Sequence, residues 1–231
     1  MVNILIFSPH PDDAELIIGG FILRHLCQYK ILLVNVTDGG AAGNGTVEIR
    51  MFEEQQAAET YHVDSINLGY KDGNLQFMQK EVNEKFVSII RKYRPSIILA
   101  PYKLDQHPDH KAVYKICKEA VYFAGTNIWR KQYEAFQCKN LLFYSQSYIH
   151  PGNGVIFFDV TNVYQEKIKL LNVYSSQFGE GATKTIVNTN LFDQIYFKDS
   201  YCGKVIGVEY AEQLIAENGI WCTNIFDIVK V

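Results

Sequence analysis

The stretches NILIFSPHPDD (residues 3–13) and SIILAPYKLDQHPDH (residues 96–110) decide the fold of this chain. In each, an apolar run that suits a buried strand is followed by a His-Pro-Asp turn and then by a segment with helical periodicity. Proline favours an extended backbone at the residue before it and is well tolerated at the first position of a helix. Each turn therefore predicts a junction where a strand passes into a helix.

The same alternation extends over residues 1–125. Thr46 is a predicted N-cap for the second helix, and the third helix is expected to stop before Pro95. Alternating strands and helices predict an α/β fold with a Rossmann-like, doubly wound, mainly parallel sheet. The strands are expected at 3–8, 31–36, 65–68 and 96–101, and the helices at 12–28, 47–62, 79–94 and 109–124.

The C-terminal part has a less regular pattern. Strands are expected at 141–149 and 154–160, a helix at 161–175, and a further helix within 191–217. This arrangement predicts a mixed-sheet extension of the parallel sheet. No repeat, low-complexity tract or linker interrupts the chain, so we expect residues 1–231 to form a single domain.

Composition excludes several classes of function. The net charge is −3 with dispersed lysines and arginines, which argues against binding to nucleic acid. The apolar runs are too short for membrane insertion and no leader pattern opens the chain, so we expect a cytoplasmic protein. The five cysteines are widely spaced without a CxxC pair, so the ligands of any bound metal should be nitrogen and oxygen.

Both His-Pro-Asp turns follow parallel strands, whose carboxyl ends meet at one crevice of such a sheet. His10 and Asp13 are suited to bind a metal from one turn, with a third ligand from the other turn. Two or three histidines plus a carboxylate are the usual ligands of catalytic zinc, and a further aspartate is suited to act as general base. These patterns leave open which of Asp12 and Asp13 binds the metal.

Each of these residues also has a purely structural interpretation. A lone His-Pro-Asp is usually a plain helix start, although two at matching positions are harder to explain in that way. Asp109 is as well suited to complement the helix dipole as to take part in catalysis. Arg50 would ordinarily be a solvated surface charge, but its position beside the predicted crevice favours contact with a substrate.

Several segments together resemble the LmbE-like, or PIG-L-type, zinc-dependent N-deacetylases. The resemblance covers most of the chain and is closest to the bacillithiol-biosynthesis branch, whose members deacetylate N-acetylglucosaminyl malate. The segments that carry it are His10-Pro11-Asp12-Asp13 with Glu15 and Gly19-Gly20, residues 45–50, residues 68–73, His107-Pro108-Asp109-His110, residues 174–178 and residues 203–212.

The resemblance implies a zinc-dependent hydrolase that removes the acetyl group from an N-acetylglucosamine-like sugar conjugate, a small molecule, and releases acetate and a free amine. It also implies a possible homo-oligomer. By position, the implied zinc ligands are His10, Asp13 and His110, and the implied general base is Asp12. His107 with Asp109 is implied to stabilise the intermediate or to protonate the amine. Arg50 is the implied sugar contact, and Tyr201 is the implied mobile tyrosine, with Tyr196 as second choice.

One departure from the family pattern concerns the loop after the second strand. Many relatives have a Gly-Glu pair there, whereas this chain reads Thr37-Asp38-Gly39-Gly40-Ala41. The missing carboxylate leaves the identity of the sugar conjugate open. Two other functions are compatible with parts of the pattern: a non-catalytic module that binds a sugar or nucleotide-sugar, and a metal-dependent phosphoesterase. Two-metal phosphoesterases generally need more ligands than these two turns offer.

Overall fold

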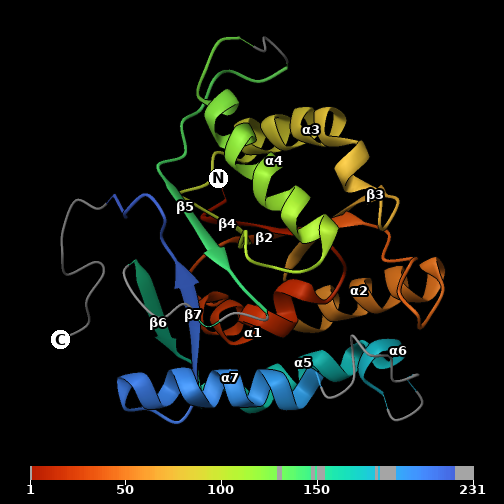
Figure 1. The fold of residues 1–231 in the computed structure, drawn as a ribbon, viewed down its shortest axis with the longest axis vertical. Helices are drawn as coiled ribbons and strands as arrows, with labels where there is room; N and C mark the ends of the chain where they lie inside the picture. The colour runs from red at the N-terminus through yellow and green to blue at the C-terminus, as the bar shows by residue number, and fades with distance from the viewer. Residues whose placement is uncertain are drawn as a thin grey trace.

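A computed structural model describes residues 2–128, 132–146, 149, 154–179, 182 and 191–221. Its seven strands form one sheet in the order β3-β2-β1-β4-β5-β7-β6 (Figure 1). The strands are β1 (Ile4–Ser8), β2 (Ile31–Thr37), β3 (Asp64–Tyr70), β4 (Ile97–Pro101), β5 (Asn140–Tyr144), β6 (Val155–Asp159) and β7 (Ala211–Ile215). The pairs among β1 to β5 are parallel, and β7 runs antiparallel to both β5 and β6. The expected parallel sheet with a mixed C-terminal extension is confirmed.

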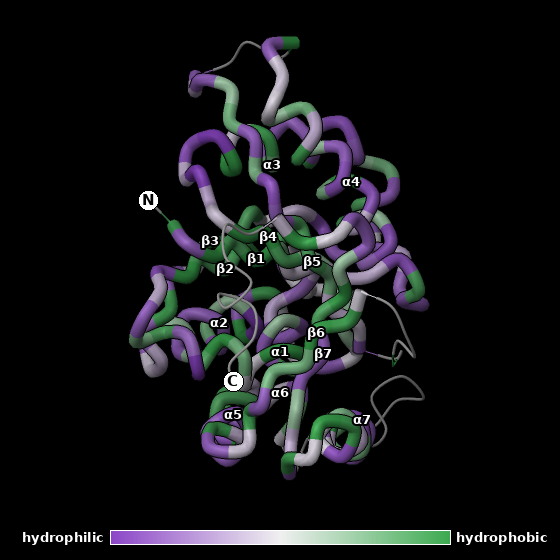
Figure 2. The backbone as a smooth tube through the Cα atoms, turned by 90° about the vertical axis from the view of Figure 1, so that its left-hand side faces the viewer, coloured by the Kyte–Doolittle hydropathy of each residue, from purple (hydrophilic) through white to green (hydrophobic). Residues whose placement is uncertain are grey.

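Helices cover both faces of the sheet. They are α1 (Asp13–His25), α2 (Val47–Tyr61), α3 (Gln79–Tyr93), α4 (Pro108–Ala124), α5 (Tyr164–Val173), α6 (Ser175–Phe178) and α7 (Leu191–Ile206), with 3₁₀ turns η1 (Leu75–Phe77) and η2 (Thr161–Val163). Helices α3 and α4 lie on one face, and α1 and α2 lie on the other (Figures 1 and 2). Outside α1 and α2, α5 contacts both helices and α6 contacts α2, whereas α7 packs against β6 and β7. No helix among the described residues is long and apolar enough to cross a membrane.

Strand β1 shows why the sheet needs both layers. All five of its residues are buried, and the four apolar ones alternate between two apolar clusters. Leu5 and Phe7 belong to the cluster under α3 and α4, where Phe7 stacks on Phe86 with ring centroids 3.8 Å apart. Ile4 and Ile6 belong to the cluster on the α1 side. A strand that is covered on both faces needs a continuous apolar run, which is what residues 4–7 provide.

Several predicted ends of elements are confirmed with their physical cause. The Thr46 side chain accepts a hydrogen bond from the Ile49 amide, as expected of an N-cap. Helix α3 ends at Tyr93, and Arg94 takes a left-handed conformation directly before Pro95. Helix α1 is shorter than expected: it covers Asp13–His25, and Asp12 precedes it with φ 102° instead of lying in its first turn.

The C-terminal elements differ more from expectation. The strand expected over 141–149 ends at Tyr144, and residues 147 and 148 lie outside the described residues. The helix expected over 161–175 is divided into η2 and α5. The helix within 191–217 ends at Ile206, and the rest of that range contains β7, a strand that the pattern did not predict.

A buried ion cluster joins α1 to these C-terminal elements. Helix α1 departs from helical geometry at Ile18, and Glu212 on β7 accepts the amide hydrogens of Gly20 at 2.8 Å and Phe21 at 2.6 Å. The fully buried Lys167 ammonium binds Glu212 at 2.7 Å and Asp199 at 2.7 Å. A Cβ at Gly20 would lie 2.8 Å from Val160, so this close approach explains the glycine at position 20.

Candidate active site

The two His-Pro-Asp turns meet at the reversal point of the strand order. Strands β1 and β4 are neighbours, but the chain runs from β1 towards β3 on one side and from β4 towards β5 on the other. The centroid of the His10 ring, after β1, lies 4.7 Å from that of His107 and 5.3 Å from that of His110, at the start of α4. The crevice at such a reversal is where open α/β sheets bind ligands, so the expected convergence is observed.

Asp13 links both turns through one oxygen. Its Oδ2 lies 2.9 Å from His10 Nδ1 and 3.0 Å from His110 Nε2, and it also accepts the His10 amide hydrogen at 3.0 Å. All three residues are buried. The three residues that the sequence resemblance implied as zinc ligands are therefore in mutual contact through this carboxylate.

Asp105 orients His110 from the other side of the ring. Its Oδ2 lies 2.8 Å from His110 Nδ1, and its Oδ1 accepts the His107 amide hydrogen at 3.0 Å. A carboxylate on the outer nitrogen of an imidazole fixes the ring and directs the other nitrogen, here Nε2, towards the site. Sequence reasoning missed Asp105, although its place five residues before His110 in KLDQHPDH was a usable signal.

Asp72 is a second carboxylate that the sequence did not single out. It follows β3, and its Oδ1 lies 3.0 Å from His10 Nε2. The turn that carries it is held by Asp109, whose carboxylate accepts the amide hydrogens of Gly73 at 2.7 Å and Leu75 at 3.1 Å. Asp109 itself is fully buried, with Oδ2 at 3.4 Å from His10 Nε2.

The expected pairing of the Asp109 carboxylate with the His107 ring takes a different form. The Asp109 backbone amide donates to His107 Nδ1 at 3.2 Å, and no hydrogen bond between the two side chains occurs within the described part of the chain. Because Nδ1 accepts, a neutral His107 carries its proton on Nε2. Burial, followed by the charges of His10 and His110, lowers the pKa of His107, which favours the neutral ring.

The donor set fits a cation. His10 Nε2 is buried and forms no hydrogen bond of acceptable geometry, despite the carboxylates near it. Ring nitrogens of His10, His107 and His110 lie within 4.8 Å of one another, as do the ligand atoms of His10, Asp72 and Asp109. His10 belongs to both sets and also contacts Asp13. All the donor atoms are nitrogen or oxygen, which zinc accepts as ligands.

The electrostatics of the cluster also favour a positive charge. Burial lowers the pKa of His110, but the charge of Asp13 and the bond to Asp105 outweigh it and raise the pKa to about 9. Burial likewise opposes protonation of His10, yet Asp13, Asp109 and Asp72 together hold its pKa well above the ordinary value. Carboxylates that favour extra protons on two imidazoles would also favour a bound cation at the same place.

Asp12 faces Arg50 and not the solvent. The Arg50 guanidinium donates from Nη1 to Asp12 Oδ2 at 2.9 Å and from Nη2 to the Pro11 carbonyl at 2.5 Å, and Arg50 is only 2% exposed. Burial raises the pKa of Asp12 more than the charge of Arg50 lowers it, which suits a group that must accept a proton. Arg50 is thus a buried partner of Asp12, and its expected contact with a sugar stays a prediction.

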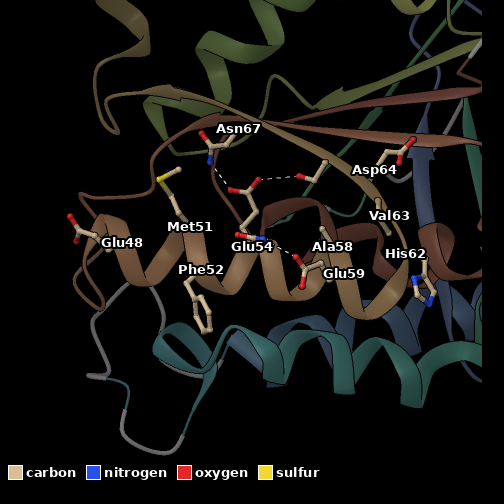
Figure 3. Close-up of a pocket in the computed structure, with 12 residues that line it drawn as sticks. Glu48, Met51, Phe52, Glu54, Ala58, Glu59, His62, Val63, Asp64 and Asn67 are labelled. Carbon is tan, nitrogen blue, oxygen red and sulfur yellow. Dashed lines mark hydrogen bonds between the residues drawn. The ribbon is translucent and has the colours of Figure 1, made fainter.

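The predicted tyrosines and the surface hollow of the structure lie apart from this cluster. Tyr201 is 56% exposed on α7, with Tyr196 on the same helix, and within the described chain no hydrogen bond or ring contact joins Tyr201 to the histidines or aspartates of the cluster. A surface hollow of about 700 Å³ lies between α2 and β3 (Figure 3), and none of the predicted site residues lines it.

Replacing Asp105 by asparagine should weaken metal binding by about ten- to a hundred-fold, because the amide no longer fixes His110 as the carboxylate does. Titration of the metal-free protein with zinc in a competing chelator measures this change. Asp64→Asn, at an exposed site on β3, is the matched control and should leave the affinity unchanged. Wild-type affinity in the Asp105 variant would contradict this role.

Comparison with known proteins agrees with this geometry. The family model PIG-L, described as GlcNAc-PI de-N-acetylase, matches residues 5–121, which include both His-Pro-Asp turns. Diacetylchitobiose deacetylase from Thermococcus kodakarensis is 29% identical over 236 residues, covering 95% of this chain and 84% of the relative. A probable N-acetyl-alpha-D-glucosaminyl L-malate deacetylase 2 from Bacillus anthracis is 25% identical over 201 residues, covering 79% of this chain and 84% of the relative.

The fold also matches solved structures. The conserved protein TT1542 from Thermus thermophilus superposes with a TM-score of 0.82 at 28% identity, covering 96% of this chain and 98% of that one. The similarity therefore extends beyond the stretch matched by the family model and includes the C-terminal strands and helices.

Proposed function

Because the chain belongs to the PIG-L family, we propose that it hydrolyses the acetamide of an N-acetylglucosamine-like sugar conjugate and releases acetate and a free amine. The observation that carries this proposal is the contact of Asp13 with both His10 and His110, beside an Asp12 that Arg50 holds in place. The two curated relatives support it, since both are named as deacetylases of N-acetylated sugars.

We propose zinc as the metal and His10, Asp13 and His110 as the residues that would hold it. Two sets of residues with ligand atoms close to one another, His10 with His107 and His110 and His10 with Asp72 and Asp109, do not include Asp13 and define the competing ligand assignments. When bound, zinc would lower the pKa of a water molecule and polarise the acetamide carbonyl.

The protein's own groups account for the proton transfers. Asp12, with its raised pKa, would accept a proton from the attacking water, and Arg50 keeps the carboxylate oriented. The Nε2–H of neutral His107 is suited to donate a hydrogen bond to the developing oxyanion. The proton that Asp12 accepts from water would pass to the leaving nitrogen, with a protonated His107 as the alternative donor, so that the C–N bond breaks to give acetate and an amine. Asp109 would act indirectly, through its backbone contact with His107 and the turn that carries Asp72.

A panel of substrates tests the proposal. Zinc-loaded protein is incubated with N-acetylglucosamine, diacetylchitobiose and N-acetylglucosaminyl malate, and with phosphate esters as controls. We expect primary amine and acetate to appear in equal amounts from at least one N-acetyl sugar and no phosphate release. Saturable sugar binding without acetate would favour the non-catalytic binding module, and phosphate release alone would favour a phosphoesterase.

Several further features stay predictions. The chain is expected to form one domain over residues 1–231, to act in the cytoplasm and to assemble as a homo-oligomer. Its expected partner is a small N-acetylated sugar conjugate, and neither nucleic acid binding nor membrane insertion is expected. Tyr201 is the predicted mobile tyrosine at the substrate.

A further inference from the structure

Residues 174–177, where α5 meets α6, contact α1, the loop before α2, and α2, the helix that carries Arg50. The Tyr174 hydroxyl donates to Glu15 Oε1 on α1 at 2.5 Å, and both side chains are buried. Gln177 Nε2 donates to the Asn44 carbonyl at 2.8 Å, in the glycine-rich loop before α2. Between these two contacts, a pair of serines binds α2 itself. The mechanism proposed above uses none of these bonds.

The serine contacts end on Glu53, a buried carboxylate one turn after Arg50 on α2. Glu53 is 4% exposed and accepts hydrogen bonds from the Ser175 hydroxyl at 3.0 Å, the Ser176 amide at 2.6 Å and the Ser176 hydroxyl at 2.6 Å. Hydrogen bonds to an ionised group are among the stronger ones in proteins, and three of them fix this carboxylate. Residues three apart lie on the same side of a helix, so a fixed Glu53 limits how far Arg50 can move.

The glycine-rich loop is enclosed between α6 and Arg50. A Cβ at Gly45, where φ is +78°, would lie 3.0 Å from the Ser176 hydroxyl and 3.6 Å from Arg50 Cδ. A Cβ at Gly39 would lie 3.0 Å from Arg50 Nε. The loop therefore packs against the Arg50 side chain on one side and against α6 on the other. A displacement of α6 would loosen the packing around the guanidinium.

We propose that residues 174–177 form a positioning element, which acts through Glu53 and the loop of residues 38–46 to hold Arg50 against Asp12. This inference rests on the proposed role of Asp12 as the base. Ser176 and Glu53 are positioning residues, because they join α6 to α2 and act on the reaction only through Arg50. The C-terminal part of the chain thus contributes to the reaction by fixing the base and not by contacting the reacting atoms.

Neighbouring glutamates on α2 provide a matched pair of variants. Ser176→Ala removes a hydroxyl that donates to Glu53, and Ser65→Ala removes a hydroxyl that donates to Glu54 at 3.0 Å, beside the surface hollow where Glu54 also binds Asn67 (Figure 3). We expect Ser176→Ala to lower kcat about ten-fold, because small misplacements of a catalytic group are costly, while KM and zinc content stay unchanged. Ser65→Ala should lose comparable stability but retain kcat.

A second measurement separates this inference from the proposed function. Hydrogen–deuterium exchange of residues 39–50 should be faster in Ser176→Ala than in the wild type or in Ser65→Ala, whether or not any sugar is turned over. Unchanged kcat in an active enzyme, an equal loss in both variants, or equal exchange of this segment would overturn the positioning role. Absence of turnover in the wild-type protein would instead refute the proposed function. The exchange result would then decide by itself whether residues 174–177 hold the segment that carries Arg50.

Discussion

Asp12→Asn is expected to lower kcat by about a hundred- to ten-thousand-fold, the range that a general base usually contributes, while the purified protein keeps its metal. The asparagine amide cannot accept a proton from water at neutral pH. The proposed ligands Asp13, His10 and His110 are untouched by the change. Steady-state kinetics on the best substrate of the panel, together with metal analysis of the same sample, measure both expectations.

Asparagine is the right replacement because of the backbone at this position. Residue 12 has φ 102°, and asparagine is among the few residues besides glycine that tolerate positive φ. Its side-chain carbonyl can still accept the hydrogen bond from Arg50, so the fold around α1 is preserved. Asp64→Asn on the exposed part of β3 is the control. Full activity of the Asp12 variant would refute its assignment as base.

The parallel half of the fold was predictable because its signals are local. The apolar run of β1, the Thr46 cap and the stop before Pro95 each act over a few residues, and the structure confirms all three. The placement of both His-Pro-Asp turns at one crevice followed from the strand–helix alternation alone. Strand β7 was missed because its buried residues include Glu212 and Gln213, whose polarity hides the pattern of a strand.

The missed parts of the site depend on contacts between distant segments. Asp72 approaches His10 from a turn 62 positions later in the chain, and the bond from Ser176 to Glu53 spans 123 positions. As an isolated residue Arg50 would ordinarily be a solvated surface charge, but the fold buries it against Asp12, and its contact with a sugar stays a prediction. Periodicity and capping report what a segment does locally, so they cannot show which buried carboxylate lies beside which imidazole.

His110→Ala is expected to abolish stable metal binding. The change removes one of the three proposed ligands and also leaves the buried Asp105 carboxylate without its imidazole partner. After dialysis against a weak chelator, metal analysis should find zinc in the wild type and in the control His62→Ala, whose side chain is exposed at the end of α2, and none in the His110 variant. Turnover should be lost together with the metal.

Metal analysis of a few variants distinguishes the proposed ligands from the two competing sets, because each set combines His10 with different residues. If His10, Asp13 and His110 hold the metal, His107→Ala and Asp72→Asn should retain zinc, and His107→Ala should lose only kcat. If the set of three histidines holds it, His107→Ala should lose zinc as well. If His10 binds it with Asp72 and Asp109, the His110 variant should keep its metal and the Asp72 variant should not, which would overturn the proposed assignment.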